Sequence, residues 1–79
     1  MTLIYEHVGI YIFFYFSDHN PPHIHIEAAE YKGTMNIKDF KTKGNMTPPM
    51  IKLAKEFITK HKNELLQMWN TQKAYQIED

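Results

Sequence analysis

The segment that most constrains the fold is the run from Val8 to Phe16, which is mainly β-branched and aromatic and is followed by a turn-forming stretch with Pro21 and Pro22. Such a run is too short for a typical helix and favours a strand that ends in a turn. Its two alternating faces are both apolar, and strands of that kind are normally buried on both sides. One helix covers one face only. We therefore expect the second face to be covered by the chain's own tail or by another subunit, with a homodimer favoured.

Period-two alternation predicts two further strands. Residues 23–29 read His-Ile-His-Ile-Glu-Ala-Ala, so both histidines and the glutamate share one face and the isoleucines share the other. Residues 34–38 alternate again after a turn or bulge at residues 30–33. Residues 40–43 are candidates for a fourth, short strand.

A helix is predicted over residues 48–69. Thr47 is a suitable N-cap, and Pro48 suits the first helical position. Apolar residues then recur at helical spacing from Met50 to Met68, and the helix either continues throughout or breaks near residues 60–63. The pattern predicts an α+β fold, a small antiparallel three- to four-stranded meander packed against one long or broken C-terminal helix.

The length of 79 residues supports a single domain over residues 1–79. We expect the sheet at about residues 2–43, the helix at about 48–69 and a polar tail at 70–79. The absence of cysteine excludes disulfides, thiolate zinc sites and cysteine nucleophiles. No apolar run approaches the roughly 20 residues of a membrane-spanning helix, and no secretory leader pattern is visible, so we expect a cytoplasmic protein without membrane contact.

The histidines are the residues most suited to chemistry. His23 and His25 project from one strand face about 6.5–7 Å apart, which allows both imidazoles to reach one ion. His19, just before the proline turn, is placed to reach the same face. Three neutral imidazoles suit a divalent metal, zinc above all, and leave an open position for hydrolysis. Asp18 or Glu27 is a candidate fourth ligand, orienting group or general base.

The same side chains allow two metal-free interpretations. Two histidines can act as general acid and general base, which suffices for transesterification of RNA and predicts a bell-shaped pH profile. In that case His61 approaches from the helix, and Lys32 or Lys38 stabilises the phosphate. The other interpretation is structural, because a His-x-His pair on a strand is often only a hydrogen-bonded polar face.

The run Asp18-His19-Asn20-Pro21-Pro22-His23-Ile24-His25-Ile26 is similar to the signature Asp-His-x-Pro-Pro-His-Phe-His-Val of the bacterial domain-of-unknown-function 4160 family. Residues 61–69 resemble the family's His-Arg-x-Glu-Leu-Leu-x-x-Trp, with Lys62 in place of arginine. This family has no settled activity. The resemblance implies a short cytoplasmic bacterial or mobile-element protein in an arrangement like a toxin–antitoxin pair. It singles out Asp18, His19, Pro21, Pro22, His23, His25, His61 and Trp69.

Two functional hypotheses follow. The first is one component of a toxin–antitoxin-like module that cleaves a phosphodiester, most plausibly in RNA. Its catalytic candidates are Asp18, His19, His23, His25 and His61, and its metal candidates are His19, His23 and His25. The second is a non-enzymatic interaction module whose aromatic strand binds a small cognate protein or its own copy. A formal net charge of zero and the lack of arginine favour the second hypothesis, because generic nucleic-acid clamps are basic.

Overall fold

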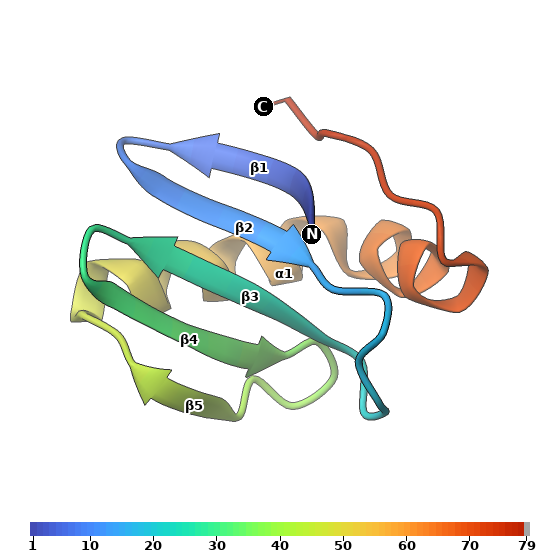
Figure 1. The fold of residues 1–79 in the computed structure, drawn as a ribbon, viewed down its shortest axis with the longest axis horizontal. Helices are drawn as coiled ribbons and strands as arrows, with labels where there is room; N and C mark the ends of the chain where they lie inside the picture. Colours follow the sequence, from blue (N-terminus) through green and yellow to red (C-terminus); the bar gives the residue numbers. More distant parts are fainter. Residues whose placement is uncertain (79) are drawn as a thin grey trace.

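A computed structural model describes residues 1–78, which form one antiparallel sheet and one helix. The strands are neighbours in sequence order, β1-β2-β3-β4-β5, and the helix packs across one face of the sheet (Figure 1). This arrangement confirms the α+β meander followed by a C-terminal helix, with five strands rather than three or four. No helix in residues 1–78 has the length and apolarity needed to cross a membrane. The elements are β1 (Thr2–His7), β2 (Ile10–Phe14), β3 (His23–Ala28), β4 (Tyr31–Asn36), β5 (Thr42–Asn45) and α1 (Pro48–Thr71).

The strand predicted over residues 8–16 is shorter than expected, because the chain turns at Val8 and Gly9. Both residues have positive φ, 50° and 76° respectively. Thr2–His7 therefore forms a separate strand, β1, which pairs antiparallel with β2. Sequence analysis missed this hairpin because a β-branched residue rarely adopts positive φ, so Val8 looked like part of a strand.

The β4–β5 hairpin also differs from the expectation. β4 starts at Tyr31, inside the predicted turn, and the fourth-strand candidate lies at Thr42–Asn45 instead of 40–43. Gly33 and Gly44 face each other across these two strands. A Cβ atom on Gly33 would come within 2.4 Å of the Lys43 carbonyl oxygen, so the close pairing of β5 requires glycine there. This pairing fixes where the lysines of β5 lie.

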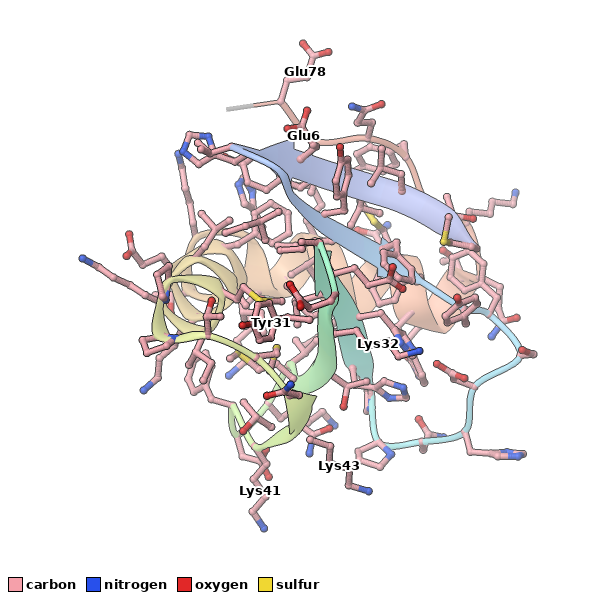
Figure 2. All side chains as sticks on the ribbon, turned by 60° about the vertical axis from the view of Figure 1, so that its left-hand side comes forward. Glu6, Tyr31, Lys32, Lys41, Lys43 and Glu78 are labelled. Atoms are coloured by element: carbon pink, nitrogen blue, oxygen red, sulfur yellow. The ribbon has the colours of Figure 1, made fainter. Side chains whose placement is uncertain are left out.

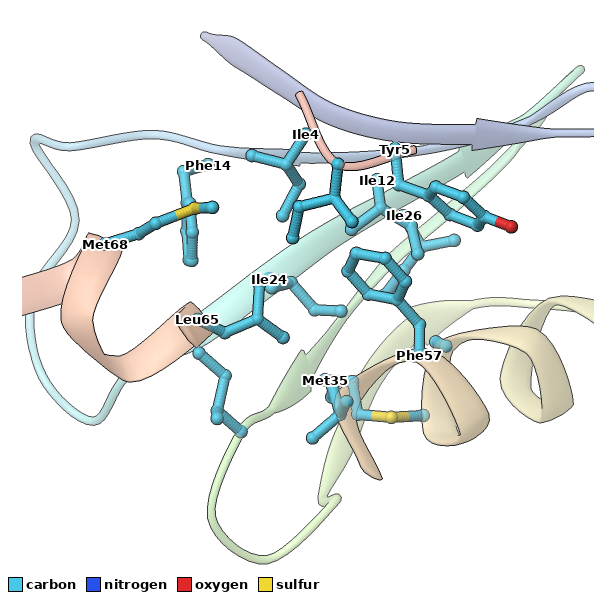
Figure 3. Packing of buried hydrophobic residues seen from close by; sticks show 14 of the residues in the cluster. Ile4, Tyr5, Ile12, Phe14, Ile24, Ile26, Met35, Phe57, Leu65 and Met68 are labelled. Carbon is cyan, nitrogen blue, oxygen red and sulfur yellow. The ribbon is translucent and has the colours of Figure 1, made fainter. Parts of the chain in front are cut away.

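The core fills the space between the sheet and α1 (Figure 3). Ile24 and Ile26 are fully buried on the helix-facing side of β3, and Phe57 and Leu65 of α1 are buried in the same cluster. The two-faced pattern predicted for β3 is therefore confirmed. Its polar residues, which include both histidines, occupy the opposite face, which we call the open face of the sheet.

The helix is interrupted at His61, where φ is −121° and ψ is 24°. This position lies within the predicted break at residues 60–63. Thr47 occupies the N-cap position, and its carbonyl oxygen accepts the first helical hydrogen bond from the Ile51 amide at 3.1 Å. Both halves of α1 contribute buried side chains, so the break does not interrupt the core.

The tail after α1 packs beside β1 rather than over the open face. The Ile77 amide donates to the Ile4 carbonyl oxygen at 2.6 Å, and the Ile77 side chain is buried in the core. The Tyr75 hydroxyl donates to the Glu64 carboxylate, and this hydrogen bond raises the pKa of Tyr75. Phe13, on the open face, is nevertheless only 2% exposed. The rings of Tyr15 and His25 pack against it.

Candidate metal centre

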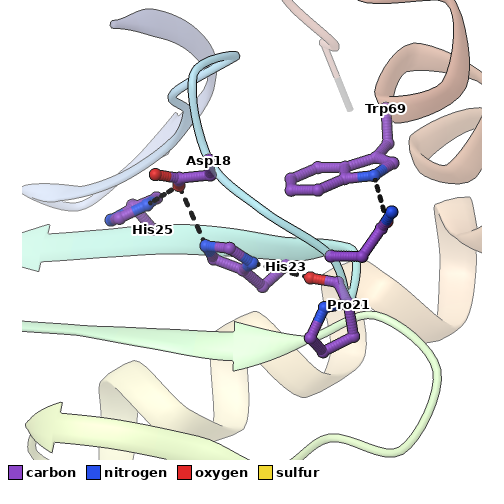
Figure 4. A network of polar contacts seen from close by, with 6 residues as sticks. Asp18, Pro21, His23, His25 and Trp69 are labelled. Carbon is purple, nitrogen blue, oxygen red and sulfur yellow. Dashed lines mark hydrogen bonds and ion pairs between the residues drawn. The ribbon is translucent and has the colours of Figure 1, made fainter.

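Asp18 and two histidines meet on the open face, at the start of β3. Asp18 lies in the loop between β2 and β3, whereas His23 and His25 belong to β3 itself. One oxygen of Asp18, Oδ2, accepts hydrogen bonds from His23 Nε2 at 2.9 Å and from His25 Nε2 at 2.7 Å (Figure 4). The three side chains are 19–26% exposed. One ligand atom from each lies within 4.8 Å of the others, as a shared metal ion requires.

The two hydrogen bonds of His23 orient its ring. Its Nδ1 lies 2.8 Å from the Pro21 carbonyl oxygen, which can only accept, so Nδ1 carries a proton. Its Nε2 faces the Asp18 carboxylate, which also accepts when ionised. With Nδ1 bound to Pro21, Nε2 is the ring nitrogen directed at Asp18.

Asp18 is held in its ionised form. Burial alone would raise its pKa, but the hydrogen bond and charge of His25, together with those of His23, outweigh burial and bring the pKa below the usual 3.8. The site thus combines one carboxylate with two imidazoles. That is a donor set typical of divalent transition metals.

Neighbouring rings fix both imidazoles in place. His25 stacks on Phe13, with ring centroids 5.5 Å apart, and meets Tyr15 edge-on at 4.6 Å. Trp69 of α1 lies 5.2 Å from the His23 ring. Its Nε1 donates to Asn20 Oδ1 at 3.0 Å, which ties the loop carrying Asp18 to the helix. The ligands are therefore positioned before any ion arrives.

Strand register places a groove beside these ligands. Thr34 of β4 lies opposite His25 on one side and opposite Lys43 of β5 on the other, so all three side chains project from the open face. A groove of about 560 Å³ extends from the β2–β3 loop to β5. Its lining includes His19, Asn36 and Lys41 in addition to Asp18 and His23. A molecule in this groove would lie against the candidate ligands.

A family model described as Domain of unknown function (DUF4160) matches residues 9–70. The chain belongs to the DUF4160 family. No curated protein and no solved structure matches it significantly. The match runs from β2 almost to the end of α1, so it includes Asp18, His23, His25 and Trp69.

The DUF4160 domain assembles only part of the set of residues expected from its sequence. Asp18, His23 and His25 come together, and Asp18 takes the place predicted for His19. His19 is exposed in the loop and lines the groove, and it is not part of the group that Asp18, His23 and His25 form. The difference is local, because Asp18 and His19 are consecutive loop residues and the hydrogen bonds to His23 and His25 come from Asp18.

His61 also lies away from the group. Its Nδ1 is 3.5 Å from Glu64 Oε1, and its ring is 4.9 Å from that of Phe57, both on the helix that covers the other face of the sheet. Lys32 lines a second groove on the open face, whereas the Lys38 carbonyl accepts a hydrogen bond from Lys62 at 3.3 Å. Sequence reasoning overlooked the loop's hydrogen bond to Trp69, since contacts 49 residues apart leave no periodic signal.

We expect Trp69→Phe to loosen the candidate metal site of this DUF4160 domain. The substitution keeps an aromatic ring beside His23 but removes the Nε1 donor to Asn20. Loss of one such hydrogen bond lowers the free energy of unfolding by about 1 kcal/mol. Substitution of residues that hold metal ligands in place typically lowers metal affinity about 10-fold or more. Urea unfolding and zinc titration calorimetry would measure both effects. Tyr75→Phe, which removes an exposed hydrogen bond, is the matched control, and equal zinc affinities for both variants would contradict the role given to Trp69.

Proposed function

We propose that this domain binds one divalent transition metal, preferably zinc, through Asp18, His23 and His25. The observation that carries the proposal is the convergence of Asp18 Oδ2 with the Nε2 atoms of both histidines. Metal-binding histidines usually donate their second ring N–H to a carbonyl or carboxylate, as His23 does to Pro21. Ligand atoms around a tetrahedral zinc lie about 3.4 Å apart, given metal–ligand distances of about 2.0–2.1 Å. The observed contacts need to widen by only about half an ångström.

Three protein ligands would leave a coordination position for water, which suits hydrolysis. We propose that the domain hydrolyses a phosphodiester, with RNA as the substrate, and that it acts in the cytoplasm as one component of a toxin–antitoxin-like module. The groove beside the ligands supports a polymeric substrate, because it is open and carries lysine side chains. The module is what the family resemblance described above implies, since the family description itself names no function.

The test is cleavage of a fluorogenic single-stranded RNA by untagged protein, with added zinc or manganese and with EDTA. We expect cleavage that EDTA abolishes and that Asp18→Asn lowers by about 100-fold or more, because the carboxylate ligand is lost. His61→Gln is the control, since His61 lies on the helix away from the group.

The alternative outcomes separate the hypotheses. Cleavage that resists EDTA and has a bell-shaped pH profile would replace the metal with acid–base catalysis by His23 and His25. No cleavage under any condition would overturn the hydrolytic proposal and leave metal binding to be judged separately.

The second candidate function is protein interaction through the β1–β2 hairpin. Val8, in the turn between β1 and β2, is 81% exposed, and Tyr11 of β2 is 45% exposed. We propose that this hairpin forms a homodimer or binds a small cognate protein. Light scattering of the purified chain should give twice its 9.4 kDa mass, and Tyr11→Glu should give a single chain. Glu6→Gln is a control on the same hairpin, and a wild-type monomer would contradict the homodimer.

A further inference from the structure

The open face carries lysines in addition to the candidate metal ligands. We infer that a single strand of RNA lies across this face, with its phosphates bound by Lys43 and Lys41 and its scissile phosphate beside Asp18, His23 and His25. We call Lys41 and Lys43, with the groove that they line, the phosphate track. The role of this track in cleavage rests on the proposed metal function. The binding itself is argued from the shape and charge of the face, and it can be tested without a metal.

Strand pairing sets the distance between the lysines and the metal ligands. His25, Thr34 and Lys43 are directly opposite one another on three consecutive strands. Neighbouring strands are about 4.8 Å apart, so the Lys43 backbone lies about 10 Å from that of His25. A lysine side chain and one nucleotide step can bridge that span. Lys41 is two residues before Lys43 and lines the same groove.

The groove is long enough for more than one nucleotide. The first part, about 560 Å³, adjoins a second part of about 430 Å³, and Thr34 and Lys43 line both. The second part continues past Tyr15 to Lys32. Figure 2 shows the side chains of Lys32, Lys41 and Lys43 around this part of the sheet. A small phosphomonoester would fill only one end of this path.

Three lysines, at positions 32, 41 and 43, line the path together with the carboxylates of Asp18 and Glu27. Lys43 forms no ion pair with any residue in the range 1–78, so its ammonium group is available to a ligand. Lys41 lies near Asp39, whose carboxylate accepts a hydrogen bond from the Lys41 backbone amide at 3.0 Å. Lys32 stands opposite Glu27. Lys43 is therefore the strongest phosphate-binding group, and Lys41 assists it.

A single strand fits this face better than a duplex. Unpaired bases can stack on aromatic side chains of a sheet, whereas duplex RNA is recognised across its shallow minor groove by shape. Tyr15 is half-buried beside the groove, and its ring stands edge-on to His25. The net charge of zero means that attraction must be local to the lysines rather than spread over the molecule.

The test is fluorescence anisotropy of a labelled 10-nucleotide single-stranded RNA in EDTA and 50 mM salt, so that binding is measured without cleavage. We expect Lys41→Gln/Lys43→Gln to weaken binding about tenfold or more and to lower the salt slope by about 1.4, which corresponds to two phosphate contacts on a single strand. Lys52→Gln/Lys55→Gln on α1 is the matched control, with the same charge change, and should bind within about twofold of the wild type.

If both double variants lost the same RNA affinity, the proposed phosphate track would be wrong, because the lysines would then act only through total charge. Tighter binding of a duplex of the same sequence, or no binding by the wild type, would also overturn it. Zinc titration of the same preparations keeps the two proposals apart. If the chain binds zinc but not RNA, the metal centre stands and the phosphate track is wrong. If it binds RNA but not zinc, the phosphate track stands and the metal centre is wrong.

Discussion

Zinc affinity should fall by more than about 100-fold when His25 is replaced by alanine, and the same loss is expected for His23→Ala. Removal of a residue that hydrogen-bonds to a metal ligand already lowers metal affinity about 10- to 100-fold. The two histidine substitutions remove a ligand atom itself, so their effect should be larger. Isothermal titration calorimetry against zinc chloride measures the change directly.

His19→Ala is the matched control for this experiment. His19 is also a histidine of the same loop and groove, but it lies outside the group formed by Asp18, His23 and His25. Its replacement should leave zinc affinity within about threefold, well below the effect of a lost outer partner. A large loss for His19→Ala, with little loss for His25→Ala, would favour the set of three histidines expected from the sequence and contradict the group of Asp18, His23 and His25.

Phe14→Ala should cost about 3–5 kcal/mol in the free energy of unfolding, the largest stability effect that we expect. Phe14 is fully buried and packs against the rings of Phe16 and Trp69, at centroid distances of 5.6 Å and 5.9 Å. A domain of this length is expected to have a total stability of about 4–12 kcal/mol, so the variant should be partly unfolded at 37 °C. Urea denaturation followed by circular dichroism checks the value.

Tyr11→Ala on the same strand provides the comparison for Phe14→Ala. Tyr11 is 45% exposed and projects from the open face, so its truncation should cost less than about 1 kcal/mol. If both variants lost the same stability, Tyr11 would be packed as tightly as Phe14. The two substitutions thus test whether Tyr11 lies outside the packed core.

The sequence was sufficient to predict those features of the fold that repeat along the chain. Alternation in residues 23–28 separated the buried isoleucines from the histidines, and helical spacing located α1 and its break near His61. The turn at Val8 escaped prediction because nothing in its side chain signals positive φ. The spacing of apolar residues therefore predicted the strands and the helix. The positive φ of Val8 could not be inferred, because a β-branched side chain disfavours it.

The candidate site was predictable only in part for a different reason. Residues two apart on one strand share a face, so His23 and His25 could be paired from their spacing alone. Whether Asp18 or His19 reaches them depends on the conformation of an irregular loop, and that loop is held by Trp69 from the far end of the chain. The lysines of β5 likewise become neighbours of His25 only through strand register.

The central claim is that Asp18, His23 and His25 hold one divalent metal, and anomalous X-ray diffraction from zinc-soaked crystals tests it most directly. Data collected on both sides of the zinc absorption edge should give one strong peak per chain at about 2.0–2.2 Å from Asp18 Oδ2 and the two histidine Nε2 atoms. An Asp18→Asn crystal should lose that peak. A zinc-soaked wild-type crystal with no peak at these atoms, or with its only peak at His19, would contradict the account.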